Sequence, residues 1–144
     1  MSLVHLGNIA DGEAAVRKSI EVKDDFATAW YDLGVITDEQ GRPQEAEVAY
    51  RKTVEIDPEY FDAWSNLGVL FIETNRRDEA EAAFRKAIGQ TRNILPWANL
   101  GLLLTQANRC KEAREILEEA RKIAPMHERV ISLGIIWLRR CAGY

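Results

Sequence analysis

The side chains that most often carry out chemistry in enzymes are scarce in this sequence. It contains two histidines, His5 and His127, and neither has a cysteine or a second histidine at the short spacing that zinc ligands require. The sequence also lacks a glycine-rich phosphate loop and a serine, histidine and acidic residue that could be assembled into a triad. We therefore predict no catalytic residue, no metal site and no cofactor, and a protein that is not an enzyme.

The two cysteines, Cys110 and Cys141, are too few for a secreted scaffold stabilised by disulfides, so we expect free thiols in a reducing compartment. Cys110 lies between Arg109 and Lys111 at the expected start of a helix, where positive charge and the helix N-terminus favour a thiolate. A redox role is one interpretation of this position. We favour the other, a partly exposed cysteine in a first helical turn without a function of its own.

Composition and charge exclude several classes of protein. The 144 residues are 47% hydrophobic and 29% charged, as in an ordered soluble domain. The net charge of -4 disfavours nucleic acids and anionic membranes, because attraction to them requires a basic surface. The N-terminal segment lacks the basic start and long apolar core of a signal peptide, and no apolar run approaches the ~20 residues that span a bilayer. We expect a cytoplasmic protein without membrane insertion.

A repeated pattern organises the chain. The sequence Trp-x-x-Leu-Gly occurs three times, and Val-x-x-Leu-Gly follows once, at a nearly constant interval. An alanine follows each tryptophan at a fixed distance, and a large side chain lies one helical turn after the alanine. The repeated residues are Trp30, Leu33, Gly34, Ala46 and Tyr50; Trp64, Leu67, Gly68, Ala80 and Phe84; Trp97, Leu100, Gly101, Ala113 and Leu117; and Val130, Leu133 and Gly134. The later intervals are one residue shorter than the first, and because the internal spacing is constant, the missing residue falls in a turn.

Each repeat has the periodicity of two amphipathic helices. Apolar residues recur at i, i+3, i+4 and i+7, and break signals such as Gly41 to Pro43, Asp57-Pro58 and Ala124-Pro125 separate the stripes. The small residues allow antiparallel helices to approach closely, and the aromatic residues fill the space beside them. Acidic and basic residues at i and i+4, for example Glu13 and Arg17, are expected on the outer face, where each pair contributes a few tenths of a kcal/mol.

The pattern resembles the tetratricopeptide repeat family, whose signature is Trp-x-x-Leu-Gly-x-x-Tyr, then Ala-x-x-x-Phe, then Pro. The unit that begins at Trp64 matches it best, whereas Thr37 and Leu104 replace the Tyr, and Arg92 and Asp24 replace the Pro. The resemblance implies an all-α fold, a right-handed superhelical solenoid of antiparallel helix pairs. The expected units of this single domain are a partial repeat (1–26), three repeats (27–60, 61–93 and 94–126) and a first-helix or capping segment (127–144).

Other helical architectures fit less well. Sel1-like repeats have a different period, and pentatricopeptide repeats use a basic groove for RNA, which the acidic balance disfavours. A four-helix bundle would not repeat its sequence from helix to helix.

In the tetratricopeptide family the first helix of each pair lines a concave groove that binds peptides. Stepping one position round each helix from the Trp-Leu-Gly stripe predicts an apolar floor with an acidic N-terminal half. The predicted groove residues are Tyr31, Asp32, Val35, Asp38, Ser65, Asn66, Val69, Ile72, Asn99, Leu102 and Thr105. The resemblance thus implies a protein-interaction scaffold that binds a peptide segment with apolar and basic side chains.

Two variants of the family can be compared at these positions. The variant that grips chaperone carboxylates uses lysine and arginine, and Asp32 and Asp38 here would repel a carboxylate. The superhelical domain of the O-linked N-acetylglucosamine transferase hydrogen-bonds a peptide backbone with a ladder of asparagines. Asn66 and Asn99 agree with that ladder, but Asp32 and Ser132 do not.

The last helical segment provides an alternative function. Residues 130–138 are apolar nearly all round, and Ile131, Ile135 and Leu138 form a row that could be a protein interface. Self-association into a homo-oligomer through incomplete terminal repeats is the second hypothesis. The third is that the chain is part of a longer array.

Overall fold

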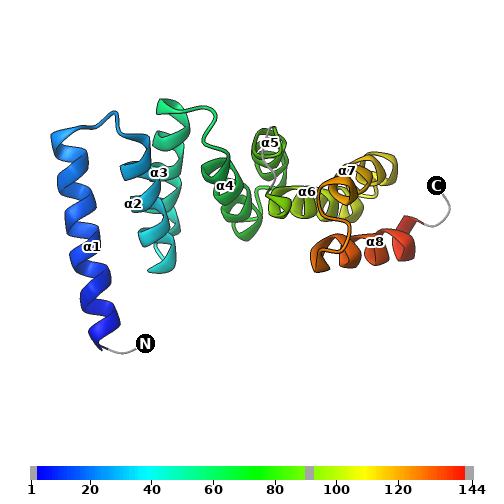
Figure 1. Cartoon of the computed structure of the whole chain (residues 1–144), viewed down its shortest axis with the longest axis horizontal. Coiled ribbons are helices and arrows are strands. Elements are labelled where there is room, and N and C mark those ends of the chain that lie inside the picture. The colour runs from blue at the N-terminus through cyan, green and yellow to red at the C-terminus, as the bar shows by residue number, and fades with distance from the viewer. Residues whose placement is uncertain (1–2, 90–92, 142–144) are drawn as a thin grey trace. The chain divides into compact units, whose positions relative to one another are not determined.

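The computed structural model describes residues 3–89 and 93–141, with side chains from residue 11 onward. These residues form α-helices joined by short turns, without a strand among them, so the predicted all-α solenoid fold is confirmed. The helices are α1 (Leu3–Val22), α2 (Ala27–Glu39), α3 (Pro43–Ile56), α4 (Phe61–Glu73), α5 (Arg77–Ala87), α6 (Ile94–Gln106), α7 (Cys110–Ile123) and α8 (Glu128–Cys141) (Figure 1). The side chain of His5 and the whole of Arg92 lie outside the described residues.

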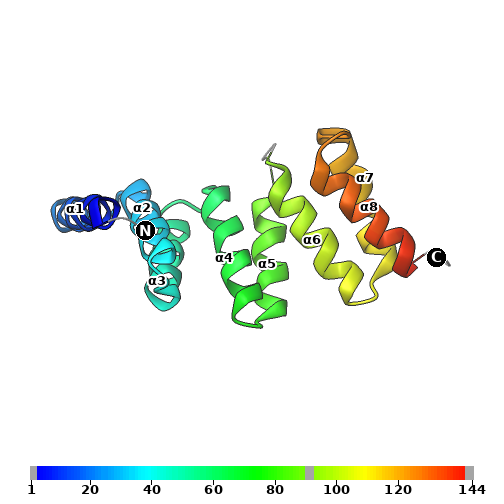
Figure 2. The ribbon, with the colours of Figure 1, turned by 90° about the horizontal axis from the view of Figure 1, so that it is seen from below.

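The chain divides into two compact units that are described separately. Unit 1 comprises residues 1–67, which include α1 to α3 and the first part of α4. Unit 2 comprises residues 68–144, which include the rest of α4 and α5 to α8. Because the boundary lies inside α4, each unit contains one complete helix pair or more together with part of a neighbouring helix. Figure 2 shows the helices α5 to α8 of unit 2 in a second view.

In unit 1 the pair α2 and α3 is held together at the position of the repeated glycine. An added Cβ at Gly34 would lie 2.5 Å from the ring of Tyr50, which is 1% exposed. Gly34 therefore allows the two helices to approach until the tyrosine ring fills the space beside the glycine. This contact explains why a glycine and a large aromatic residue recur together at a fixed spacing in the sequence.

Unit 2 repeats this contact once and then changes it. An added Cβ at Gly68 would lie 2.4 Å from the ring of the fully buried Phe84. At Gly101 the nearest side chain is Leu133 of α8, so this glycine serves the packing of α6 on the next first helix. The core here comprises Ile94, Leu117, Ala120, Val130 and Leu133.

Two tryptophans of the repeat, both in unit 1, bind the turn that precedes their helix. Trp30 Nε1 donates to the carbonyl of Asp24 at 2.7 Å, and Trp64 Nε1 donates to the carbonyl of Pro58 at 2.9 Å. In both cases the acceptor lies in the turn that leads into the helix, so the indole ties each first helix to its entry turn. The indole N–H of Trp97 is buried and has no partner among the described residues.

The turns between the helices of a pair share one backbone conformation. Gly41, Asn75 and Asn108, which occupy equivalent positions in successive repeats, have φ of 71°, 60° and 58°. Asparagine tolerates this left-handed region better than other residues with a side chain, so it can replace the glycine that ends the first helix of the pair.

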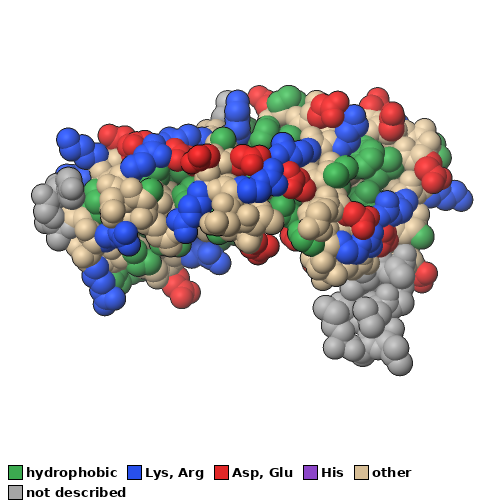
Figure 3. Space-filling view, turned by 180° about the vertical axis from the view of Figure 1, so that it is seen from behind, with side chains coloured by type: hydrophobic (Ala, Val, Ile, Leu, Met, Phe, Trp, Pro, Cys, Tyr) green, Lys and Arg blue, Asp and Glu red, His purple; other side chains and the backbone are tan. Residues whose placement is uncertain are grey.

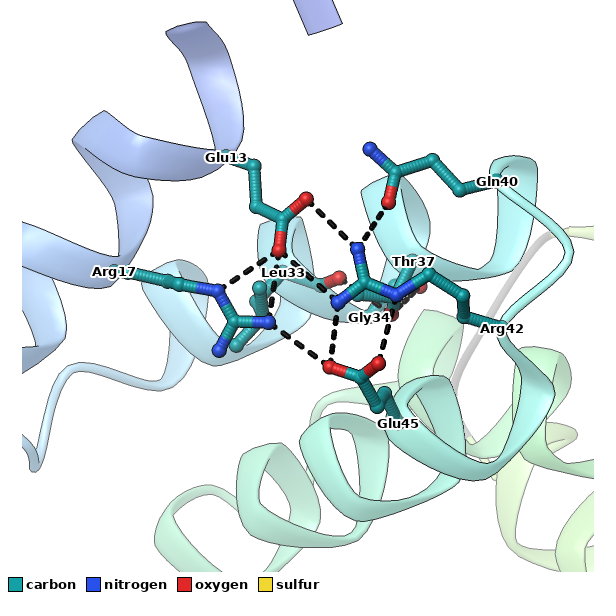
Figure 4. A network of polar contacts seen from close by, with 8 residues as sticks. All are labelled: Glu13, Arg17, Leu33, Gly34, Thr37, Gln40, Arg42 and Glu45. Carbon is teal, nitrogen blue, oxygen red and sulfur yellow. Dashed lines mark hydrogen bonds and ion pairs between the residues drawn. The ribbon is translucent and has the colours of Figure 1, made fainter. Parts of the chain in front are cut away.

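The i, i+4 ion pairs do more than was predicted from the sequence. Arg42, in the turn between α2 and α3, donates to Glu13 of α1 at 2.9 Å and to Glu45 of α3 at 2.5 Å, and it also contacts Gln40 (Figure 4). Arg17 joins Glu13 and Glu45, so the network connects α1 with α3 and with the turn between α2 and α3. These hydrogen bonds, mainly from Arg42, lower the pKa of Glu13 to about 2.

Unit 2 contains the equivalent network. Arg109 pairs with Glu81 at 2.5 Å and with Glu112 at 2.6 Å, and Arg85 pairs with the same two glutamates. The acidic and basic side chains that intermix on the surface in Figure 3 are therefore partly organised into bonds between neighbouring repeats.

The expectation of free thiols is wrong. Cys110, the first residue of α7, and Cys141, the last residue of α8, form a disulfide with their Cα atoms 5.6 Å apart, and both are buried. Because α7 and α8 are antiparallel, the start of one lies level with the end of the other. Nearby, Trp137 Nε1 donates to the carbonyl of Cys110 at 2.9 Å, and Arg140 Nε donates to Asn108 Oδ1 at 2.8 Å. Free thiols were the basis for expecting a reducing compartment, so the disulfide leaves that expectation without support.

Candidate functional site

The predicted groove residues of unit 1 lie on α2 and the first part of α4. Tyr31 and Val35 are partly exposed, whereas Asp32 and Asp38 are exposed. Ser65 is a correction, because it is 7% exposed and therefore offers little surface to a ligand.

Asn66 organises a cluster of tyrosines. Its Nδ2 group lies 3.2 Å from the hydroxyl oxygen of Tyr50 and 3.5 Å from that of Tyr31. The ring centroid of Tyr31 lies 5.9 Å from that of Tyr50 and 4.8 Å from that of Tyr60. The amide thus contacts the hydroxyls of two rings, and the third ring, Tyr60, packs against Tyr31. In this structure Asn66 positions tyrosines, a role that the asparagine-ladder comparison did not suggest.

Burial, more than any other effect, raises the pKa of the three tyrosine hydroxyls. For Tyr31 and Tyr60, the charges of Asp62 and Asp32 raise the pKa further. The hydroxyls therefore stay protonated at neutral pH. Tyr60 was not predicted as a site residue, because it precedes α4 and only helical positions were considered.

Four of the five predicted groove residues of unit 2 line a pocket of about 150 Å³ among α4, α5 and α6. Asn99 and Leu102 line it from α6, and Val69 and Ile72 line it from α4. Its lining residues are Val69, Ile72, Phe84, Asn99, Leu102, Leu103 and Gln106. The sequence pattern predicted four of these residues but missed Leu103 and Gln106 of α6 and Phe84 of α5, whose ring forms part of the pocket as well as the core.

A second pocket, of about 140 Å³, lies between α6 and α8. It shares Asn99 and Leu102 with the first, and its remaining lining is Ala98, Arg129, Ser132, Leu133 and Ile136. The two pockets therefore adjoin along α6, with one amide and one aliphatic side chain common to both.

Thr105 is the second correction to the predicted groove. It is fully buried, and its hydroxyl donates to the carbonyl of Gly101 at 2.8 Å. A threonine in a helix satisfies its hydroxyl in this way when no external partner is near. The residue therefore belongs to the packing of unit 2 and does not line its surface.

The row predicted on α8 is exposed. Ile131, Ile135 and Leu138 have exposed fractions of 45%, 47% and 55%. The positions that correspond to Ile131 and Leu138 in α6 are Ala98 and Thr105, with exposed fractions of 7% and 0%. The described helices thus cover these positions on α6 but leave larger apolar side chains uncovered on α8.

The described residues contain no group of three or more histidine, cysteine, aspartate or glutamate side chains placed to hold a metal ion. Within the same residues, no helix has the length and apolarity needed to cross a membrane.

A family model described as the middle TPR-like domain of cilia- and flagella-associated protein 70 matches residues 7–124. The chain belongs to this family. The assignment confirms the tetratricopeptide resemblance, and the fold of such repeats is typically a non-enzymatic scaffold for protein interactions. A search of curated proteins returns no significant match.

Solved structures agree with the fold. PilF of Pseudomonas aeruginosa is 24% identical, with a TM-score of 0.80, over 94% of this chain and 63% of that protein. A tetratricopeptide repeat protein of Parabacteroides merdae is 17% identical, with a TM-score of 0.84, over 96% of this chain and 56% of that one. The Cut9-Hcn1 complex of the APC/C contains a chain that is 19% identical, with a TM-score of 0.77, over 94% of this chain and 26% of that one. This TPR-like chain thus spans less than two thirds of each of these three proteins.

Proposed function

We propose that this TPR-like chain is a scaffold that binds an extended peptide segment of a partner protein along its first helices. The observation that carries the proposal is the pair of adjoining pockets in unit 2, which share Asn99 and Leu102. Two apolar side chains of a peptide would occupy the pockets, and Asn99 between them would hydrogen-bond the intervening peptide backbone. An extended segment places successive side chains on opposite sides, so alternate residues would point into the pockets.

The lining supports an apolar ligand. The first pocket is formed mainly by aliphatic and aromatic side chains, with amide groups from Asn99 and Gln106 as its polar part. Small apolar pockets with a few fixed polar groups are typical binding sites, because burial provides affinity and the polar groups provide orientation.

The test begins with a displayed library of random peptides selected against the whole chain. Affinity of the selected peptide is then measured by calorimetry for the parent, Leu102→Asp and Asn99→Ala. We expect Leu102→Asp to weaken binding about tenfold or more, because it places a charge in both apolar pockets. Val48→Asp is the matched control, since Val48 is 64% exposed on α3 and lines neither pocket. Unchanged binding in Asn99→Ala and Leu102→Asp would show that the groove assignment is wrong.

A second candidate function is self-association through α8. The exposed row of Ile131, Ile135 and Leu138 favours it, because the α6 positions equivalent to Ile131 and Leu138 are covered by protein. The occupant in this case would be a second copy of the chain, which would make the protein a homo-oligomer.

A further inference from the structure

The charge of unit 1 is distributed unevenly between its first and second helices. In α2 and in residues 61–67 of α4 there are four carboxylates and no lysine or arginine. The acidic residues are Asp32, Asp38, Glu39 and Asp62. The positive side chains of unit 1 lie on α1, on α3 and in turns, where Arg17, Lys23, Arg42 and Lys52 pair with neighbouring carboxylates. The surface formed by α2 and the start of α4 is therefore negative.

Two tyrosine rings lie within this negative surface. Tyr31 and Tyr60 pack with their centroids 4.8 Å apart and remain partly exposed. Tyr31 is held by Asn66 and by the buried Tyr50, so its ring orientation is fixed before a ligand arrives. Fixed rings bind a flat ligand at a low entropy cost, since little side-chain freedom remains to be lost.

Asp32 follows Tyr31 directly in α2, Asp62 lies two residues after Tyr60 in the first turn of α4, and both are exposed. The charge of each carboxylate also raises the pKa of the Tyr31 and Tyr60 hydroxyls. A cation placed against the rings would therefore meet two negative charges as well as two aromatic faces.

We propose that Tyr31, Tyr60, Asp32 and Asp62 form a subsite for one arginine side chain of the bound peptide. A guanidinium group is planar, stacks on aromatic rings and donates in pairs to carboxylates, whereas an ammonium group does neither as well. The subsite lies wholly in unit 1 and differs from the apolar pockets of unit 2. The proposal rests on the proposed function, since the arginine belongs to a peptide that the first helices bind.

The experiment uses the whole chain and the peptides selected from the library described above. We expect the selected sequences to contain an arginine, and affinity to fall about tenfold when citrulline, its neutral analogue, replaces it. Lysine at the same position should recover only part of the loss. The double variant Asp32→Asn, Asp62→Asn should weaken the arginine peptide but bind the citrulline peptide as the parent does. Glu59→Gln, an exposed change nearby, is the control.

The outcomes separate the two proposals. Suppose that Leu102→Asp weakens binding, but that the parent protein binds the citrulline peptide as tightly as the arginine peptide and the double variant binds the arginine peptide as tightly as the parent. The arginine subsite is then overturned, and the groove assignment stands. If the lysine peptide and the arginine peptide bind with equal affinity, the site recognises charge alone and the guanidinium assignment is wrong. If no peptide is selected, or if neither the pocket variants nor the subsite variants matter, both proposals fail.

Discussion

Three glycines of unit 1, Gly12, Gly34 and Gly41, lie in different surroundings. An added Cβ at Gly12 of α1 or at Gly41 would meet no atom within 4 Å, whereas at Gly34 it would lie 2.5 Å from the Tyr50 ring. Gly41 also has a φ of 71°, a region that L-residues enter at a cost. The same substitution therefore tests three physical effects at the level of a single residue.

We expect Gly12→Ala to raise the free energy of unfolding by about 0.5–1 kcal/mol, because alanine is the better helix former. Gly41→Ala should lower it by about 1 kcal/mol through backbone strain. Gly34→Ala should lower it by about 1–3 kcal/mol or more, because a buried ring must move. Urea denaturation measures all three. A Gly34→Ala protein as stable as the parent would contradict the close contact between α2 and α3.

At the scale of the element, the ends of α7 and α8 are joined by the disulfide. The bond closes a segment with a sequence separation of 31 residues, and it is reinforced by Trp137 and Arg140. We expect reduction to lower the free energy of unfolding by about 2–4 kcal/mol, because a closed loop restricts the unfolded chain. Hydrogen exchange should rise in the last turns of α8 and remain unchanged in the α2 and α3 pair of unit 1.

The control for this prediction is the double variant Cys110→Ala, Cys141→Ala, whose melting temperature should not respond to a reductant. The mass of the alkylated protein, prepared without reductant, reports whether the thiols are bonded. Two alkylated cysteines in the folded, oxidised preparation would contradict the assigned disulfide.

The elements also show which features the sequence could predict. The periodicity of Trp, Leu, Gly and Ala depends on contacts within each helix pair, and such local contacts leave a regular pattern that predicted the helices. The Cys110 to Cys141 bond left no such pattern, because it depends on the start of α7 lying level with the end of α8. The number of cysteines was used only to predict the redox compartment, and that prediction did not consider which helix ends lie side by side.

The candidate site was predicted unevenly for a related reason. Val69, Ile72, Asn99 and Leu102 line one pocket, as their helical positions suggested. Thr105 occupies the position equivalent to Ile72 but is buried, because packing in unit 2 depends on the neighbouring helices and not on position in the repeat. Tyr60 was missed because it lies in a turn, where helical spacing says nothing.

At the scale of the whole molecule, stability is expected to arise from each helix and its nearest neighbours, as in other repeat proteins. The ion-pair networks of Arg42 in unit 1 and Arg109 in unit 2 serve this purpose, since each links successive repeats. The surface that most clearly lacks such a neighbour among the described residues is the row of Ile131, Ile135 and Leu138 on α8. A second copy of the chain would bury this row on association.

We expect the parent chain to show a concentration-dependent increase in sedimentation coefficient, and Ile131→Asp combined with Ile135→Asp to abolish it. A charge on each of two exposed isoleucines opposes burial of the row, but it should cost the isolated chain little stability. Val48→Asp, which adds one charge at an exposed apolar site on α3, should associate like the parent. A parent that remains monomeric at the highest concentration tested would rule out self-association through α8. It would leave peptide binding along the first helices as the function to pursue, because the pockets of unit 2 do not depend on a second copy.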